Sequence, residues 1–162
     1  RYKFACVLEI ADSLIESGNV NKAKEILLEQ CLVAARELDN KDYYPREAKH
    51  YRLIETARRL VGLQQSVDAE NVLDEATVNL LPMEKRRTER AGVPVEDIAL
   101  LLLELGKKHK AIDLLVAGWL NLDQSDLECL TPEEKGAIKL DFVMRHPTCQ
   151  RFAKALLARE KK

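Results

Sequence analysis

Residues 7–27 read VLEIADSLIESGNVNKAKEIL, and the same pattern of alanines and leucines occurs three times in this chain of 162 residues. Each copy has two alanines twelve residues apart. The pairs are Ala11 with Ala23, Ala57 with Ala69, and Ala99 with Ala111. Small residues at this spacing, one on each of two consecutive helices, allow an antiparallel pair to approach closely. The sequence therefore predicts a repeated helical hairpin.

The apolar residues that flank the alanines keep one register in all three copies. They are Val7, Leu53 and Val95 before the first alanine, Leu14, Leu60 and Leu102 after it, and Leu27, Leu73 and Leu115 after the second. Residues at these positions would bury the seam between two helices. Because a single hairpin cannot cover its own apolar surface, we expect the hairpins to stack into a solenoid of the kind that binds other proteins.

Composition and charge fit a soluble helical protein. Hydrophobic residues make up 46% of the chain and charged residues 33%, which suits one domain or a short repeat array with a buried core. The formal net charge of -1 gives no overall attraction to nucleic acid or anionic membranes. The longest apolar run, residues 98–103, is far shorter than the roughly 18 residues that cross a bilayer. We expect no membrane partner.

The cysteines point to a reducing environment. They are widely separated and form no CxxC pair, and Cys6 and Cys31 fall inside predicted helices, where we expect them to be buried. This usage favours an intracellular compartment, cytoplasmic or nuclear. His146 and Cys149 are close in sequence, but Pro147 interrupts the helix that would align them and no second ligand pair accompanies them. We therefore predict no metal and no cofactor.

Motifs for catalysis are missing from the sequence. His50, His109 and His146 lie far apart, without a serine or cysteine in a catalytic arrangement. No glycine-rich phosphate loop and no HExxH spacing is present. We expect a binding protein rather than an enzyme. Because the chain starts with arginine and ends in a charged run, we also expect it to be part of a longer chain or a larger complex.

Helix boundaries follow from turn residues and from the apolar period. The first hairpin should combine helices at 2–16 and 20–38, the second should start after Pro45 and turn near residues 62–66, and the third should run from 95 to 120. Gln64 takes the place that Gly18 and Gly106 hold in the other turns, so either the preceding helix ends sooner or the second turn is wider.

Further signals mark the breaks and the C-terminal part of the chain. Leu81-Pro82 should end the second hairpin, and Gly92-Val-Pro94 should start the next helix. Thr131 to Glu134 has the pattern of a capping box that opens a helix to about residue 144, and a last helix should follow residue 147 or 148. We expect repeats over 1–121, divided at about 1–44, 45–93 and 94–121, and capping helices over 122–162.

The turn-and-alanine segments resemble the tetratricopeptide repeat. The segments are GNVNKA at 18–23 and GKKHKA at 106–111, each after a leucine-rich helix and before an amphipathic one. The resemblance covers residues 5–121. The copies are offset by 46 and 42 residues, which makes this a long-period variant of a repeat of about 34 residues. The resemblance implies an all-α solenoid of three hairpins plus a C-terminal capping helix pair.

The resemblance also implies a site, because the first helix of each tetratricopeptide pair lines the concave face. The positions that would contact a peptide or helix of a partner protein are Leu8, Asp12, Ile15, Ile54, Arg58, Val61, Glu96, Leu100 and Leu103. Arg59, from the basic residues beside them, is added as a residue that would bind an acidic partner segment. Family members that clamp the carboxylate of chaperone tails use lysine and asparagine at several of these places. Leu8, Asp12, Ile54 and Arg58 stand there instead, so we expect no such clamp.

Two clusters admit both a structural and a functional interpretation. Residues 98–105 carry more leucines than one helix stripe needs, so either the last two helices cover them or they form a hydrophobic partner site. The basic residues within 46–59 and 85–90 form either a solvated face or a docking site for an acidic partner segment. Glutamates among these basic residues and a low aromatic content of 5% argue against nucleic acid.

The sequence thus predicts an intracellular protein-interaction scaffold that binds a peptide or helix of a partner, which could be acidic, on its concave face. One alternative is a structural or oligomerisation segment of a multisubunit assembly. An RNA-binding helical repeat is a further, less favoured alternative, and it would show a steep salt dependence.

Overall fold

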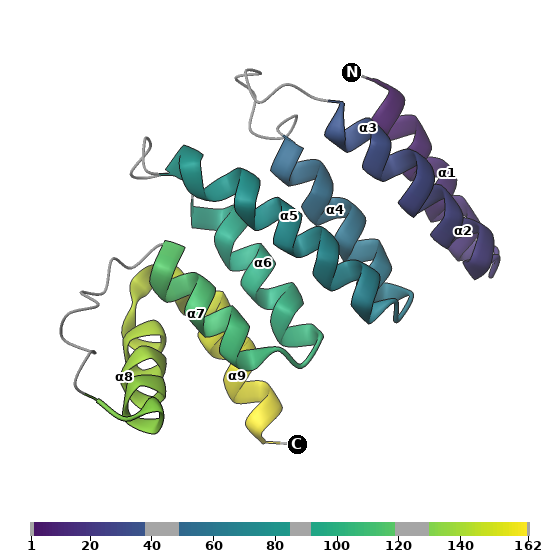
Figure 1. Cartoon of the computed structure of the whole chain (residues 1–162). Helices are drawn as coiled ribbons and strands as arrows, with labels where there is room; N and C mark the ends of the chain where they lie inside the picture. The colour runs from purple at the N-terminus through teal and green to yellow at the C-terminus, as the bar shows by residue number, and fades with distance from the viewer. Residues whose placement is uncertain (1, 38–48, 85–91, 119–129, 162) are drawn as a thin grey trace. The chain divides into compact units, whose positions relative to one another are not determined.

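In the computed structural model, every described secondary-structure element is helical (Figure 1). The described residues are 2–37, 49–84, 92–118 and 130–161. The chain divides into two compact units, residues 1–82 and 83–162. Over the described residues the fold class is therefore all-α, as predicted. The third hairpin shares a unit with the C-terminal helices rather than with the first two hairpins.

Two helical hairpins make up the first unit. α1 (Tyr2–Glu16) packs against a continuous helical rod formed by α2 (Val20–Ile26), a π-helical turn (Leu27–Cys31) and α3 (Leu32–Arg36). We call this segment the α2–α3 rod. α4 (Lys49–Gly62) and α5 (Ser66–Glu84) form the second hairpin and lie side by side in Figure 1. The α2–α3 rod also packs against α4, through α3 and the π-helical turn, so it joins the two hairpins.

The second unit pairs the third hairpin with the C-terminal helices. α6 (Gly92–Glu104) and α7 (Lys108–Gly118) pack against each other, α8 (Pro132–Arg145) packs against α7, and α9 (Gln150–Glu160) packs against α6 and α8. The predicted capping box at the start of α8 is confirmed. The Glu134 amide donates to Thr131 Oγ1 at 3.3 Å, and the Thr131 amide donates to the Glu134 carboxylate at 2.9 Å.

All six alanines of the repeated pattern are inaccessible to solvent, with exposed fractions of 0%. The leucines that follow the second alanines, Leu27, Leu73 and Leu115, are at most 1% exposed. An alanine side chain ends at Cβ, so it lets two helix backbones come close while the neighbouring leucines fill the remaining space. The burial predicted for the alanine positions is confirmed in all three hairpins.

The three hairpin turns share one hydrogen-bond pattern. The amides of Gly18, Gln64 and Gly106 each donate to the carbonyl three residues earlier, and the next amide donates to the carbonyl five residues earlier, at 2.8–3.0 Å. This is the Schellman arrangement, which requires a left-handed residue after the helix. The φ angles of the three residues are +77°, +59° and +76°. Both interpretations of the second turn were therefore wrong, because Gln64 takes the left-handed conformation and the turn keeps its width.

Two features of the helices differ from those predicted. α5 continues through Pro82 to Glu84, and the second helix of the first hairpin contains the π-helical turn. The predicted start of the next helix at Gly92-Val-Pro94 is confirmed, because α6 begins at Gly92. Proline has no amide to donate to the carbonyl four residues earlier, so α5 continues past Pro82 with one intrahelical hydrogen bond fewer. The boundaries predicted within 38–48 and 119–129 and the basic residues predicted at 85–90 lie outside the described residues.

Gln64→Gly should raise the free energy of unfolding by about 0.5–1 kcal/mol, because glycine adopts the left-handed conformation without the steric cost of a Cβ. Gly106→Ala should lower it by about 1 kcal/mol. No atom lies within 4 Å of a Cβ built on Gly106, so the backbone conformation alone would cause this loss. Urea unfolding followed by circular dichroism measures both changes. A loss of stability in Gln64→Gly would contradict the assigned turn.

Candidate partner-binding surface

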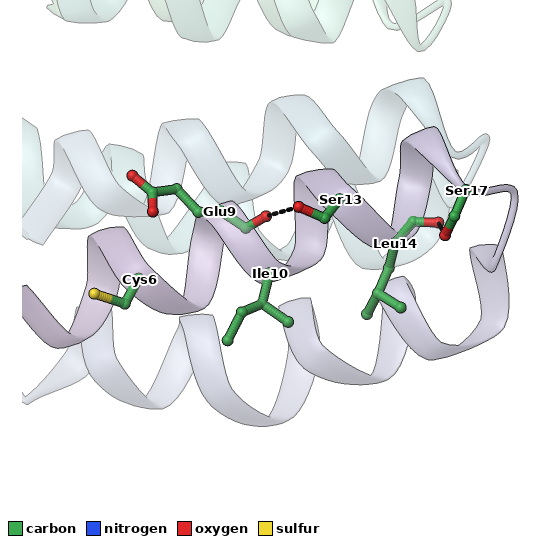
Figure 2. Close-up of a pocket in the computed structure, with 6 residues that line it drawn as sticks. All are labelled: Cys6, Glu9, Ile10, Ser13, Leu14 and Ser17. Atoms are coloured by element: carbon green, nitrogen blue, oxygen red, sulfur yellow. Dashed lines mark hydrogen bonds between the residues drawn. The ribbon is translucent and has the colours of Figure 1, made fainter.

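One side of α1 carries an exposed apolar strip. It forms a shallow hollow lined by Cys6, Glu9, Ile10, Ser13, Leu14 and Ser17 (Figure 2). Cys6, Ile10 and Leu14 are four residues apart, so they fall on one face of the helix. Figure 2 shows the side chains of Ile10 and Leu14 pointing to the same side. We call the six lining residues the α1 strip.

The two serines in the α1 strip are satisfied within their own helix. Ser13 Oγ donates to the Glu9 carbonyl at 2.9 Å, and Ser17 Oγ donates to the Leu14 carbonyl at 3.0 Å. Hydroxyls bonded back to helix carbonyls place little demand on an incoming polar group. The α1 strip therefore offers a largely apolar contact surface, with the exposed Glu9 carboxylate at its edge.

The corresponding positions in the second hairpin are buried. Counted from the first alanine, Ile10 corresponds to Thr56, yet Ile10 is 51% exposed and Thr56 is 0% exposed. Leu14 is half-buried, and its counterpart Leu60 is 0% exposed. Packing of α1 against its own partner helix thus leaves this side open. The burial of Thr56 must come from outside its hairpin.

The α2–α3 rod covers the side of α4 that carries Thr56. Near the start of the rod, Lys24 lies 2.9 Å from Asp68 in the first turn of α5, close to the end of α4. At the end of the rod, Arg36 lies 2.7 Å from Glu75 on α5, which is also 3.6 Å from Lys49 at the start of α4. The rod therefore runs antiparallel to α4. No described residue of the first unit occupies the equivalent place on α1.

Arg59 links the two hairpins of the first unit through hydrogen bonds. Its Nε and Nη2 donate to the two carboxylate oxygens of Asp12 on α1, at 3.0 and 3.1 Å, and Nη1 donates to the Glu55 carboxylate. Burial acts to lower the pKa of Arg59, but the hydrogen bonds and charges of Asp12 and Glu55 outweigh it, so the pKa lies above its usual value. Asp12 and Arg59, both predicted to bind a partner, instead bind each other.

Other members of the basic cluster in the second hairpin also have partners within the unit. The Arg52 guanidinium lies over the Phe4 ring, 5.0 Å from its centroid, and is only 7% exposed. Arg58 is exposed, with its Nε 3.4 Å from the Glu55 carboxylate. The described part of this cluster thus serves mainly to join α4 to its neighbours.

In the second unit, α9 covers the predicted groove positions. Glu96 is 6% exposed and accepts a hydrogen bond from the Phe152 amide at 3.0 Å, at the start of α9. Arg159 near the end of α9 donates to the Leu103 carbonyl. Leu103 is 4% exposed and Leu100 is half-buried. The structural interpretation of the leucine-rich segment therefore holds for α9, whereas α8 packs on α7.

The remaining predicted site residues offer little open surface. Leu8 and Ile15 are half-buried, and Ile54 is 1% exposed. The α1 strip was missed in the sequence because its apolar residues Cys6 and Leu14 were both expected to be buried. The available signal was that every first helix of a stacked array needs a neighbour, and no described residue of the first unit fills that role on α1.

The cysteine predictions had mixed outcomes. Cys6 is exposed on the α1 strip, so its predicted burial was wrong, because no described helix of the first unit covers that side of α1. Cys31 is buried as predicted, and burial raises the pKa of its thiol to about 11. Burial also raises the pKa of Cys149. His146 Nδ1 lies 2.7 Å from Thr148 Oγ1, within a local turn.

In the described ranges, the histidine, cysteine and acidic side chains form no group of three or more that could hold a metal ion. None of the helices in these ranges combines the length and the apolar character needed to cross a membrane.

A scan of protein-family models and searches of curated proteins and solved structures found no significant match. The geometry of the chain itself is therefore the basis for inferring its function. Its main elements are the shared turns, the buried alanines and the open side of α1.

His50, at the start of α4, should make stability depend on pH. Its ring is 7% exposed, its Nδ1 has no hydrogen-bond partner among the described residues, and burial lowers its pKa below 6.5. The unfolded chain therefore binds more protons as the pH falls, so the stabilisation is present above about pH 6.5 and is lost as the pH drops through the folded pKa. Each unit of pKa difference corresponds to about 1.4 kcal/mol.

We expect His50→Phe to remove this loss between about pH 7.5 and 5.5. Phenylalanine suits the site because Phe4 holds the same register position in the first hairpin and is also buried. The exposed His109, changed in the same way, serves as the control and should retain the loss. Urea unfolding at several pH values measures it, and an unchanged pH profile in His50→Phe would contradict the assignment.

Proposed function

We propose that this chain is a protein-interaction module of the helical-repeat type, with tetratricopeptide-like hairpins that stack into a solenoid, and that it binds an amphipathic helix of a partner protein on the α1 strip. The observation that carries the proposal is the contrast between Ile10, 51% exposed, and its counterpart Thr56, 0% exposed beneath the α2–α3 rod. The proposed partner helix would lie on α1 as that rod lies on α4.

The size and rigidity of the α1 strip support this function. Full burial of an isoleucine or leucine side chain contributes about 1.5–3 kcal/mol, and Ile10 and Leu14 are both incompletely buried. α1 is held in place by the Arg59–Asp12 pair and by the contact between Phe4 and Arg52. A surface that is already ordered loses little entropy on binding, so even a small apolar contact can contribute to affinity.

The mode of recognition is the binding of an amphipathic helix to an apolar helical surface. It differs from the concave-face site implied by the tetratricopeptide resemblance. On the third hairpin, α9 already covers Glu96 and Leu103, and on the first two hairpins Asp12 and Arg59 bind each other. The open side of α1 is therefore the better-supported docking surface in the first unit.

A peptide with the sequence of residues 20–36 is the probe that this packing suggests. Asn21→Lys in the peptide, joined to Glu25 by a lactam, would stabilise the helix through two positions that are exposed in the chain. Fluorescence anisotropy with the full chain should show saturable binding that Ile10→Asp weakens at least about ten-fold, a loss of about 1.4 kcal/mol.

Two controls make the result specific. Val67→Asp places the same charge at a position that is 74% exposed and lies outside the α1 strip, so it should leave the affinity unchanged. A peptide of scrambled sequence should not bind. Equal affinity of Ile10→Asp and the original chain, with circular dichroism showing both folded, would contradict the proposed function, as would the absence of binding at millimolar peptide.

A further inference from the structure

The residues that bind the α2–α3 rod on the second hairpin differ from the residues at the same register positions of the first hairpin. Asp68 stands one residue before the second alanine of its hairpin, and Lys22 stands at the same place in the first hairpin. Asn19 likewise corresponds to Gln65. Lys22 and Asn19 are both exposed. At this register position the second hairpin therefore carries an acidic residue and the first hairpin a basic one.

In the interface between the two hairpins, Asp68 and Gln65 bind the ammonium group of a lysine. Lys24 Nζ lies 2.9 Å from the Asp68 carboxylate and donates to Gln65 Oε1 at 2.6 Å. A helix seated on α1 in the same way would bring its own equivalent of Lys24 against Lys22 and Asn19. A lysine there would meet a like charge, whereas a carboxylate could accept hydrogen bonds from the Lys22 ammonium and the Asn19 amide.

At the other end of the interface, both hairpins carry a glutamate at the same register position. Glu75 stands six residues after the second alanine of its hairpin and accepts hydrogen bonds from Arg36 Nε at 3.0 Å and Nη2 at 2.7 Å. Glu29 stands at the same count in the first hairpin, within the π-helical turn, and is exposed. A basic residue near the end of an incoming helix would therefore meet a carboxylate, as Arg36 does.

We propose that the partner helix lies antiparallel to α1 with an acidic residue near its N-terminal end, facing Lys22, and an arginine or lysine near its C-terminal end, facing Glu29. This inference rests on the proposed function and adds the charge pattern of the partner. The same pattern stabilises the partner helix itself, because acidic residues near the N-terminus and basic residues near the C-terminus complement the helix dipole.

A charge exchange between probe and chain tests the inference. The lactam peptide 20–36 is prepared with Lys24 and with Lys24→Glu, and each form is titrated against the full chain and its Lys22→Glu variant. The Glu peptide should bind the original chain about three- to ten-fold more tightly than the Lys peptide, and Lys22→Glu should reverse the preference. Both preferences should shrink in about 0.5 M salt.

Lys154→Glu is the matched control, since it changes the net charge equally at an exposed position on α9. It should leave the preference for the Glu peptide unchanged. If both peptides bind equally and Ile10→Asp still abolishes binding, the charge pattern is wrong and the proposed function stands. If neither peptide binds, both are wrong. If sedimentation shows a dimer of the chain that Ile10→Asp dissociates, a second copy occupies the α1 strip and the inference is overturned.

Discussion

The close approach of two helices at a pair of buried alanines is the constraint on which the rest of this structure depends. A residue with only a Cβ atom allows the two backbones to come together, and the leucines on either side then fill the seam. The Schellman turn places the second helix directly after the first and fixes the register between them. The six alanines are 0% exposed in all three hairpins, so both units of the chain use the same kind of contact between helices.

Contacts between hairpins in the first unit decide which surfaces remain available. Arg59 binds Asp12, so two residues that the sequence assigned to a binding face instead join the hairpins. Arg36 and Glu75 add a second, more exposed ion pair between them, with the Arg36 side chain 51% exposed against 21% for Arg59. The opposite side of α1 has no such neighbour among the described residues of the first unit. An apolar surface is therefore left open on a rigid helix.

The sequence predicted the features that depend on local pattern. Apolar spacing placed the first helix at residues 2–16, and Thr131 with Glu134 marked the capping box. It did not predict features that depend on neighbours or on competing interactions. Gln64 adopts a left-handed conformation because the surrounding hydrogen bonds impose it. Ile10 is exposed because no described residue of the first unit covers its side of α1. Periodicity identifies apolar positions but not the element that covers them.

The most direct test of the alanine constraint is the free energy of unfolding of Ala57→Leu compared with Ala158→Leu, measured in urea. Ala57 is 0% exposed in the seam of the second hairpin, whereas Ala158 is exposed on α9. Three extra carbon atoms at the close contact should cost about 1–3 kcal/mol, and the same change at Ala158 should stay within about 0.5 kcal/mol. If both variants are as stable as the original chain, the helices do not meet closely at the alanines, and the account of the fold is wrong.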